Sequence, residues 1–170
     1  MIDDAQLQNL AQQLATYLKP LSQHLSTAES CTGGWIAKTI TDINGSSSWF
    51  EAGIVTYSNA AKMTLLGVDE SLLSQYGAVS QPVVEAMAKG ALKNTHSDFA
   101  VAVSGIAGPA GGSEEKPVGL VHFSWVSNNG WLQSTQHIFE GNREAIRRQT
   151  VAMALHVLTE HLQNHSSPGG

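Results

Sequence analysis

The first apolar residues of the chain share a helical spacing of three or four positions: Leu7, Leu10, Ala11, Leu14 and Leu18. This pattern predicts an amphipathic helix over residues 3–19, which ends at Pro20 because a proline ring cannot continue a helix. A second helix is predicted over residues 32–43, with Thr32 as its N-terminal cap.

Runs rich in β-branched and aromatic residues predict the strands. Residues 25–29 form a short first strand, and residues 49–57 are predicted as a second, buried strand. The run 99–104 is almost wholly apolar, so it must be covered on both faces. Residues 119–127 and 131–139 are expected to pair as an antiparallel hairpin, because the Asn-Gly between them is a strong turn signal.

Helices fill most of the remaining sequence. Short ones are predicted over residues 58–67 and 71–76, a longer one from Ser80, and a final amphipathic one over residues 142–162. Helices that alternate with strands, together with one hairpin, predict an α/β fold in which a mixed sheet lies between helical layers.

The composition narrows the class of protein. With 42% hydrophobic and 14% charged residues the chain is globular, most simply one domain over residues 1–165 with a disordered tail over residues 166–170. A net charge of −5 argues against nucleic-acid binding. One cysteine excludes an internal disulfide and suits a reducing cytoplasm. Since no apolar run approaches the roughly 20 residues that cross a bilayer, we expect a cytoplasmic protein without a membrane partner.

Ser30 and Lys62 are the first candidates for chemistry. Ser30 follows the first predicted strand and Lys62 lies in the helix after the second, and such positions converge at one edge of an α/β sheet. A serine becomes nucleophilic when a base takes its proton, and a partly desolvated lysine can be that base. In the alternative interpretation Ser30 only caps the strand end and Lys62 is a solvated helix residue.

A run of three serines, Ser46 to Ser48, offers a second source of hydroxyl groups. It follows Asn44-Gly45, which favours a turn, so a plain loop is one interpretation. In the other, one of these hydroxyls faces Lys62 and Tyr57 as a nucleophile or proton relay. The Tyr57 phenol could then donate to an oxyanion or to a serine, although the sequence alone favours an ordinary half-buried aromatic role.

Cys31 is an alternative nucleophile, because a thiol at a helix N-terminus has a lowered pKa; otherwise it is an inert buried residue. The histidines give little support for a metal site. His161 and His165 are four residues apart without carboxylate or thiol companions, and His122 and His137 are expected to face each other across the hairpin with no third ligand. We predict no catalytic metal.

The glycine-rich loop over residues 105–112 follows the apolar strand and allows the backbone to approach a ligand closely. It has neither the lysine of a P-loop nor the spacing of the dinucleotide fingerprint, so a flexible surface loop is the alternative. Gly33-Gly34 at one helix start and Arg143 near another could form a phosphate clamp. For Arg143 a surface salt bridge is the other interpretation.

Six motifs follow one another between about residue 7 and residue 162: AESCTGGWIAK, GSSSWFEAGIVTYSNAAK, GAVS, VSGIAGPAGG, KPVGLV and GNREAIRRQT. Together they resemble the CinA C-terminal domain family. No molybdopterin-binding-like domain precedes them, so we expect the short stand-alone form. Ser104 stands where many relatives have threonine in TGIAGP, and the hydroxyl is retained.

The resemblance implies a three-layer α/β/α fold, a homodimer, and hydrolysis of nicotinamide mononucleotide (NMN) to nicotinic acid mononucleotide and ammonia in NAD salvage. It implies no metal or organic cofactor. The residues that it places in the reacting centre are Ser30, Ser47, Tyr57 and Lys62, with Ser30 and Ser47 both open as the nucleophile. The substrate-side residues by the same resemblance are Gly33, Gly34, Ser46, Ser104, Gly105 and Arg143.

Two other functions stay open at this point. A non-catalytic nucleotide-binding module linked to competence or DNA damage would need the glycine loops and Arg143, but not Lys62 or Tyr57. An amidase with Cys31 as nucleophile would lose activity when the thiol is blocked. Release of ammonia from NMN distinguishes an enzyme from the nucleotide-binding module. Treatment with iodoacetamide distinguishes a Cys31 amidase from a serine amidase.

Overall fold

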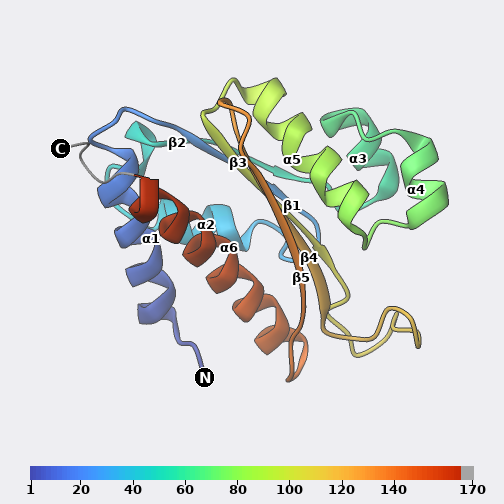
Figure 1. Cartoon of the computed structure of the whole chain (residues 1–170). Coiled ribbons are helices and arrows are strands. Elements are labelled where there is room, and N and C mark those ends of the chain that lie inside the picture. Colours follow the sequence, from blue (N-terminus) through green and yellow to red (C-terminus); the bar gives the residue numbers. More distant parts are fainter. Residues whose placement is uncertain (166–170) are drawn as a thin grey trace.

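A single mixed sheet of five strands forms the centre of the computed structural model, which describes residues 1–165 (Figure 1). The strands are β1 (Leu25–Glu29), β2 (Phe50–Val55), β3 (Phe99–Gly105), β4 (Leu120–Ser127) and β5 (Leu132–Ile138). They lie in the order β2-β1-β3-β4-β5; β1 runs parallel to both of its neighbours, and β3, β4 and β5 pair antiparallel. The predicted tail at 166–170 lies outside the described residues.

Helices cover both faces of this sheet. They are α1 (Asp4–Leu18), α2 (Trp35–Thr41), α3 (Asn59–Leu66), α4 (Glu70–Tyr76), α5 (Gln81–Thr95) and α6 (Arg143–His165), with a 3-10 turn, η1, at Ser46–Ser48. Figure 1 shows α1, α2 and α6 on one side of the strands and α3, α4 and α5 on the other. The predicted three-layer α/β/α fold with a mixed sheet, in one domain, is therefore confirmed.

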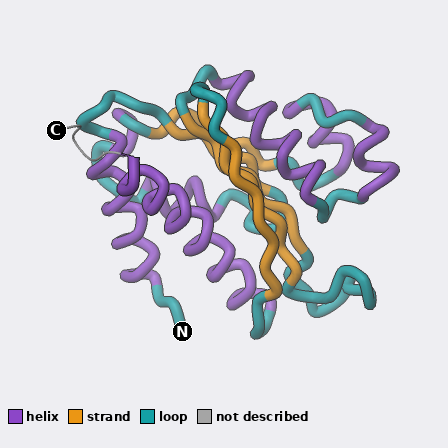
Figure 2. Tube along the Cα trace, in the orientation of Figure 1, coloured by secondary structure: helices purple, strands orange, loops and turns teal. Residues whose placement is uncertain are grey.

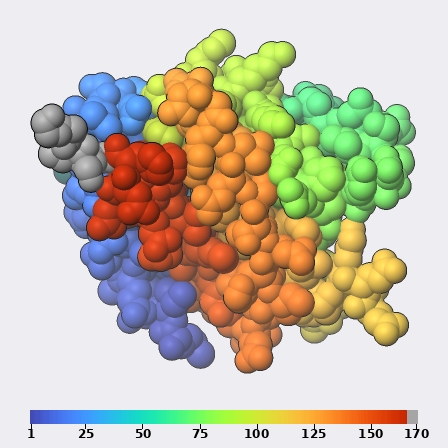
Figure 3. Space-filling view, in the orientation of Figure 1, coloured from blue at the N-terminus to red at the C-terminus, as the bar shows by residue number. Residues whose placement is uncertain are grey.

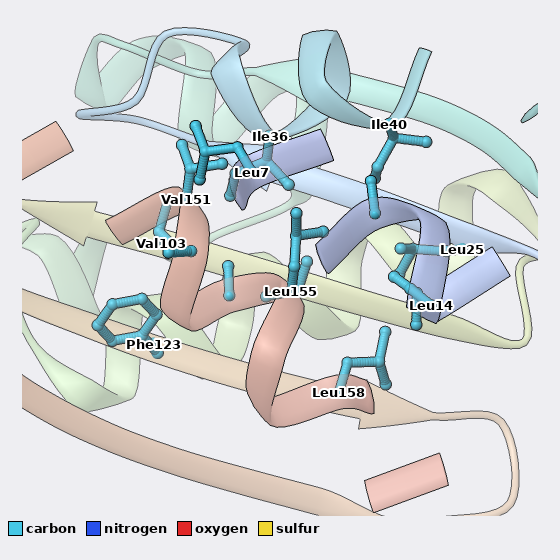
Figure 4. Close-up of a cluster of buried hydrophobic side chains, with 14 of the residues drawn as sticks. Leu7, Leu14, Leu25, Ile36, Ile40, Val103, Phe123, Val151, Leu155 and Leu158 are labelled. Atoms are coloured by element: carbon cyan, nitrogen blue, oxygen red, sulfur yellow. The ribbon is translucent and has the colours of Figure 1, made fainter. Parts of the chain in front are cut away.

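The buried apolar residues form two clusters, one in each space between sheet and helices. The larger lies under α1, α2 and α6 (Figure 4) and includes Leu14, Ile36 and Leu155. The central strand β3 contributes to both, because its side chains alternate: Val101 and Val103 face the larger cluster, and Ala100 and Ala102 face the smaller one under α3–α5. The small alanines on one side allow α5 to approach the sheet closely.

Local signals in the sequence account for most helix boundaries. The Asp3 side chain caps α1 in a capping box with Gln6. Ser58 accepts a hydrogen bond from the Ala61 N–H at the start of α3, and Gly67 ends that helix in the left-handed conformation, with a φ of 67°. These two caps fix the helix that carries Lys62.

Three expectations need correction. The strand predicted as buried over 49–57 is β2, an edge strand whose residues alternate between half-buried and exposed, because only β1 pairs with it. Thr32 does not cap the second helix; Gly34 occupies that position. His122 and His137 do not face each other, since the register pairs His137 with Val121 and so turns the two rings to opposite sides of the sheet.

A long loop and an edge strand lie at the margins of the sheet. Figure 2 shows the segment 106–119 as a long loop beyond the carboxyl end of β3. In Figure 3, β5 (orange) lies at the surface between α6 (red) and the green helices α3–α5. Within residues 1–165, no helix combines the length and apolar character needed to cross a membrane.

Candidate active site

The site is built on the turn that follows β1, residues 30–34. Gly33 and Gly34 adopt φ angles of 61° and 99°, a region that side chains with a Cβ rarely enter, so the turn can be tight. The Ser30 N–H donates to the Val103 carbonyl at 3.1 Å, which ties the start of the turn to the neighbouring strand β3. The backbone of Ser30 is therefore held by the sheet itself.

Strand alternation decides which way each side chain of this segment faces. Ser26 bonds to the hydroxyl of Thr95 on α5, and Ala28 packs in the cluster under α3–α5. The odd-numbered residues face the other layer, where the Glu29 carboxylate accepts from α2. Continuing the alternation by one residue turns the Ser30 hydroxyl toward α3.

Lys62 of α3 meets Ser30 there. Its side chain is only 1% exposed, and its Nζ lies 3.1 Å from the Ser30 Oγ. The same nitrogen donates to the carbonyls of Thr56 at 2.8 Å and Tyr57 at 3.3 Å. No carboxylate pairs with this lysine among the salt bridges of residues 1–165. The predicted convergence of Ser30 and Lys62 at one edge of the sheet is present in the structure.

The surroundings of Lys62 favour a neutral amine. Burial lowers the pKa of Lys62 from its ordinary value, because a buried ammonium loses its hydration. A neutral amine has two N–H donors and one lone pair. The two carbonyls can take the donors, which leaves the lone pair free to accept the proton of the Ser30 hydroxyl.

A cavity of about 300 Å³ opens in front of this pair, and we call it the Ser30 cavity. Its polar lining consists of Ser30, Tyr57, Asn59, Lys62, Ser104 and Arg143. The glycine-rich loop after β3 forms another wall, through Gly105, Gly108 and Gly111. A Cβ on Gly105 would lie 2.6 Å from the Val121 side chain, so glycine is required here for packing as well as for backbone approach.

Arg143 lies at the mouth of the Ser30 cavity, at the first position of α6. Its guanidinium donates to the Gly108 carbonyl at 2.9 Å and to the Tyr57 hydroxyl at 3.2 Å. The Tyr57 side chain is 63% exposed, so its phenol belongs to the rim of the cavity. Arg143 and Tyr57 therefore form a polar rim at the mouth of the cavity, opposite the buried Ser30–Lys62 pair.

The environment of Cys31 argues against a nucleophilic thiol. Cys31 lines the same cavity but is 7% exposed, and burial raises the pKa of its thiol to about 12, with the nearby Glu29 acting in the same direction. The expected lowering by a helix N-terminus does not occur, because desolvation outweighs it. The thiol stays protonated at neutral pH and is a poor nucleophile.

Gly33 and Gly34 were expected on the substrate side, but they line a separate hollow on the other side of the turn. This Gly33 hollow measures about 420 Å³, and its lining consists of Asp4, Thr32, Gly33, Gly34, Trp35, Lys38, Arg147 and Arg148. Its charged groups are mostly paired: Lys38 bonds to Asp42 at 2.6 Å, and Arg148 bonds to Asp4 and Glu144. The two glycines shape the turn rather than the Ser30 cavity.

Ser46 and Ser47 lie at the wrong end of β2 to face Lys62 of the same chain. They precede the strand, in η1, whereas Lys62 follows it. A strand of this length separates its two ends by roughly 17 Å. Ser46 is buried and Ser47 is exposed to solvent, and neither lines the Ser30 cavity. Within one chain the geometry thus favours Ser30 over Ser47 as the nucleophile.

Sequence reasoning missed two charged residues that hold the turn. Arg147 donates from Nε to the Cys31 carbonyl at 3.0 Å and from Nη2 to the Thr32 carbonyl at 2.9 Å. The Glu29 carboxylate bonds on the opposite side of the turn. The sequence signal for Glu29 is its place at the end of a buried strand, because an acidic residue is rarely buried without a partner.

Comparisons with known proteins show the family of this chain. Residues 7–162 match the CinA C-terminal domain family, so the chain belongs to that family, and the resemblance seen in the motifs is confirmed. The "Nicotinamide-nucleotide amidohydrolase PncC" of Escherichia coli strain K12 is 54% identical over 162 residues, covering 95% of this chain and 98% of the relative. A Pseudomonas putida protein of the same name is 56% identical over 146 residues, covering 86% and 91%.

A solved structure gives the same fold. The competence/damage inducible protein CihA from Agrobacterium tumefaciens superposes with a TM-score of 0.90 at 45% identity, covering 96% of this chain and 98% of that one. Within residues 1–165, three or more histidine, cysteine or acidic residues nowhere gather as a metal site would require. The absence of a metal and of a cofactor stays a prediction.

Proposed function

We propose that this chain hydrolyses the carboxamide of NMN to nicotinic acid mononucleotide and ammonia, with Ser30 as nucleophile and Lys62 as base. The observation that carries the proposal is the 3.1 Å approach of the buried Lys62 Nζ to the Ser30 Oγ, at the inner end of a polar cavity. The names of the relatives that match nearly the whole chain support the choice of substrate.

The reaction begins with proton transfer. The neutral Lys62 amine accepts the Ser30 proton as the Oγ attacks the carboxamide carbon, and a tetrahedral intermediate forms. Backbone N–H groups beside Ser30 stabilise its oxyanion. As the C–N bond breaks, Lys62 returns the proton to the leaving nitrogen, and ammonia departs. Water then attacks the acyl-serine with Lys62 again accepting a proton, and the acid product and Ser30 hydroxyl are released.

The shape of the Ser30 cavity sets the orientation of the substrate. The carboxamide enters first, to reach the buried pair, so the ribose phosphate stays at the mouth near Arg143 and Tyr57. A guanidinium binds a phosphate through two parallel hydrogen bonds, and Arg143 already presents both terminal nitrogens at this rim. Ser104 and Gly105 line the path between the two ends.

A direct assay tests the function. Purified protein incubated with NMN is expected to release ammonia and nicotinic acid mononucleotide in equal amounts, and a Ser30→Ala protein prepared in parallel is expected to release neither. Binding of NMN without ammonia release by the unchanged protein would instead support the non-catalytic nucleotide-binding module.

We further propose that the protein is a homodimer, as its family resemblance implies. The outer edge of β2 has no strand beside it within residues 1–165, and Glu51 is the one charged residue of β2, which contains neither lysine nor proline to protect an open edge. Ser47 can approach a Lys62 only on a second copy of the chain. Light scattering after size-exclusion chromatography tests the dimer, and a mass equal to one chain contradicts it.

A further inference from the structure

Glu29 is a fully buried carboxylate beside the proposed nucleophile, with 0% of its surface exposed. It takes part in none of the salt bridges found in residues 1–165. A buried charge without a partner is costly unless hydrogen bonds satisfy it. Glu29 is satisfied by hydrogen bonds from the Thr32 hydroxyl and from two N–H groups of α2, with a longer contact of 3.5 Å from the Thr27 hydroxyl.

These donors join the turn to the helix behind it. The Glu29 Oε1 accepts from the Thr32 hydroxyl at 2.6 Å and from the Ile36 N–H at 2.8 Å, and the Oε2 accepts from the Ala37 N–H at 3.0 Å. The first N–H groups of any helix lack partners inside the helix. The N-terminal cap of α2 is Gly34, which has no side chain to serve them, so Glu29 takes over that role.

These hydrogen bonds hold the backbone on both sides of Ser30. The carboxylate bonds forward across the turn to Thr32 and α2, while Arg147 bonds to the carbonyls of Cys31 and Thr32 from α6. Ser30 is the residue between the anchored strand end and this doubly held turn. Its backbone torsions, and hence the direction of its hydroxyl, are set from both sides.

A direct part in proton transfer is excluded by the strand geometry. Glu29 and Ser30 are neighbours, so their side chains point to opposite faces of the sheet, the carboxylate toward α2 and the hydroxyl toward Lys62 on α3. Glu29 therefore acts through the backbone that joins the two residues.

We propose that Glu29 is a positioning residue that holds the Ser30 hydroxyl in line with Lys62 by fixing the turn of residues 30–34. The inference rests on the proposed serine–lysine chemistry. It requires that a change at Glu29 reduces the reactivity of Ser30 in molecules that are still folded, and leaves binding of NMN at the cavity mouth nearly unchanged.

The test is Glu29→Gln, which keeps the size but turns an NH₂ group toward backbone donors. Two rates are measured well below the melting temperature: turnover of NMN, and labelling of Ser30 by a fluorophosphonate, which needs no substrate. We expect both rates to fall about 100-fold per folded molecule, as for a small misplacement of a reacting group, with KM for NMN changed less than threefold. Wild-type rates in folded Glu29→Gln protein would overturn the inference.

Ser26→Ala is the matched control. Ser26 is equally buried on the same strand and bonds to Thr95 and Ser97, but at the opposite end from Ser30. It should lower the melting temperature and leave both rates per folded molecule unchanged; an equal loss of rate in Ser26→Ala would show that general loosening of β1 is the cause.

If Glu29→Gln does not fold, Thr32→Val decides the question, because it removes only the 2.6 Å hydrogen bond and leaves the bonds to α2. A roughly tenfold loss of Ser30 labelling is expected, and an unchanged rate overturns the inference. Labelling that behaves as expected in a protein that releases no ammonia from NMN would disprove the proposed function and leave the role of Glu29 intact.

Discussion

The turn of residues 30–34 separates two hollows that are alike in size and unlike in chemistry. The Ser30 cavity and the Gly33 hollow measure about 300 and 420 Å³, and the first turns of α6 line one with Arg143 and the other with Arg147 and Arg148. One contains a buried amine beside a hydroxyl, and this amine forms no salt bridge with a carboxylate of residues 1–165. The other contains Lys38 and Arg148, which are paired with acids, and Arg147, which donates to backbone carbonyls of the turn. Cationic residues and glycines line both cavities and do not distinguish them. The Ser30 cavity differs because its lysine is buried and forms no salt bridge within residues 1–165.

Removal of the proposed nucleophile gives the largest expected effect. Ser30→Ala should lower kcat about 10⁴-fold or more, since it removes the hydroxyl that lies beside the Lys62 amine. Ser47→Ala, at the far end of β2, should cost no more than about tenfold. Steady-state ammonia release measures both. A loss in Ser47→Ala as large as that in Ser30→Ala would contradict the assignment within one chain and require a second copy to supply Ser47.

The two lysines give the next contrast. Lys62→Met should lower kcat by about 10²–10⁴-fold, the usual contribution of a general base, while Lys38→Met in the Gly33 hollow should keep the wild-type rate. The melting temperature of Lys62→Met should equal or exceed that of the wild type, because an apolar side chain replaces a buried amine. Wild-type turnover by folded Lys62→Met protein would remove the base from the mechanism.

The arginines should differ in substrate binding. Arg143→Ala is expected to raise KM for NMN about 10- to 100-fold, through loss of charge-assisted hydrogen bonds to the phosphate, with a smaller change in kcat. Arg148→Ala, in the other hollow, should leave KM unchanged. Nicotinamide riboside, which has no phosphate, provides the control: if Arg143→Ala raised its KM equally, Arg143 would not be a phosphate ligand.

The pH profile should follow the protonation of Lys62. Its pKa is lowered by burial, so the free amine becomes available below the ordinary lysine range. We expect kcat/KM to fall about tenfold for each pH unit below that pKa and to level off above it. A flat profile between pH 6 and pH 10, measured with protein shown to be folded throughout, would contradict a lysine base.

Cys31 gives the smallest expected effect. Cys31 lines the Ser30 cavity, but burial raises the pKa of its thiol to about 12, so Cys31→Ala should change kcat less than about twofold. Iodoacetamide should likewise label Cys31 much more slowly in the folded protein than in the denatured protein. Loss of activity in folded Cys31→Ala protein would restore the thiol as a candidate nucleophile.

Much of this architecture was predictable from local sequence. Hydrophobic spacing and caps gave every helix and strand within a few residues, and the positions of Ser30 and Lys62 after neighbouring strands indicated their meeting point. What stayed hidden depended on which side of a strand or turn a residue occupies. The serine run in η1 and the glycines of the turn carry suitable chemistry, yet topology places them away from the amine.

The role of Glu29 was also hidden in the sequence. An acid at a strand end gives no indication of its partners until α2 is placed behind the sheet, because its three shortest hydrogen bonds come from residues three to eight positions further along the chain. The edge position of β2 was equally inaccessible. A strand rich in β-branched residues has the same composition at a sheet edge as at its centre when helices cover part of it.

The neighbouring positions of Glu29 and Ser30 limit how β1 can change in length. Inserting or deleting one residue upstream in this strand would exchange their orientations, directing an acid at the lysine and a hydroxyl at the backbone of α2. Two-residue changes preserve both orientations. Any redesign of this enzyme scaffold that alters β1 should therefore proceed in steps of two, and an odd-numbered change should abolish nucleophile and support together.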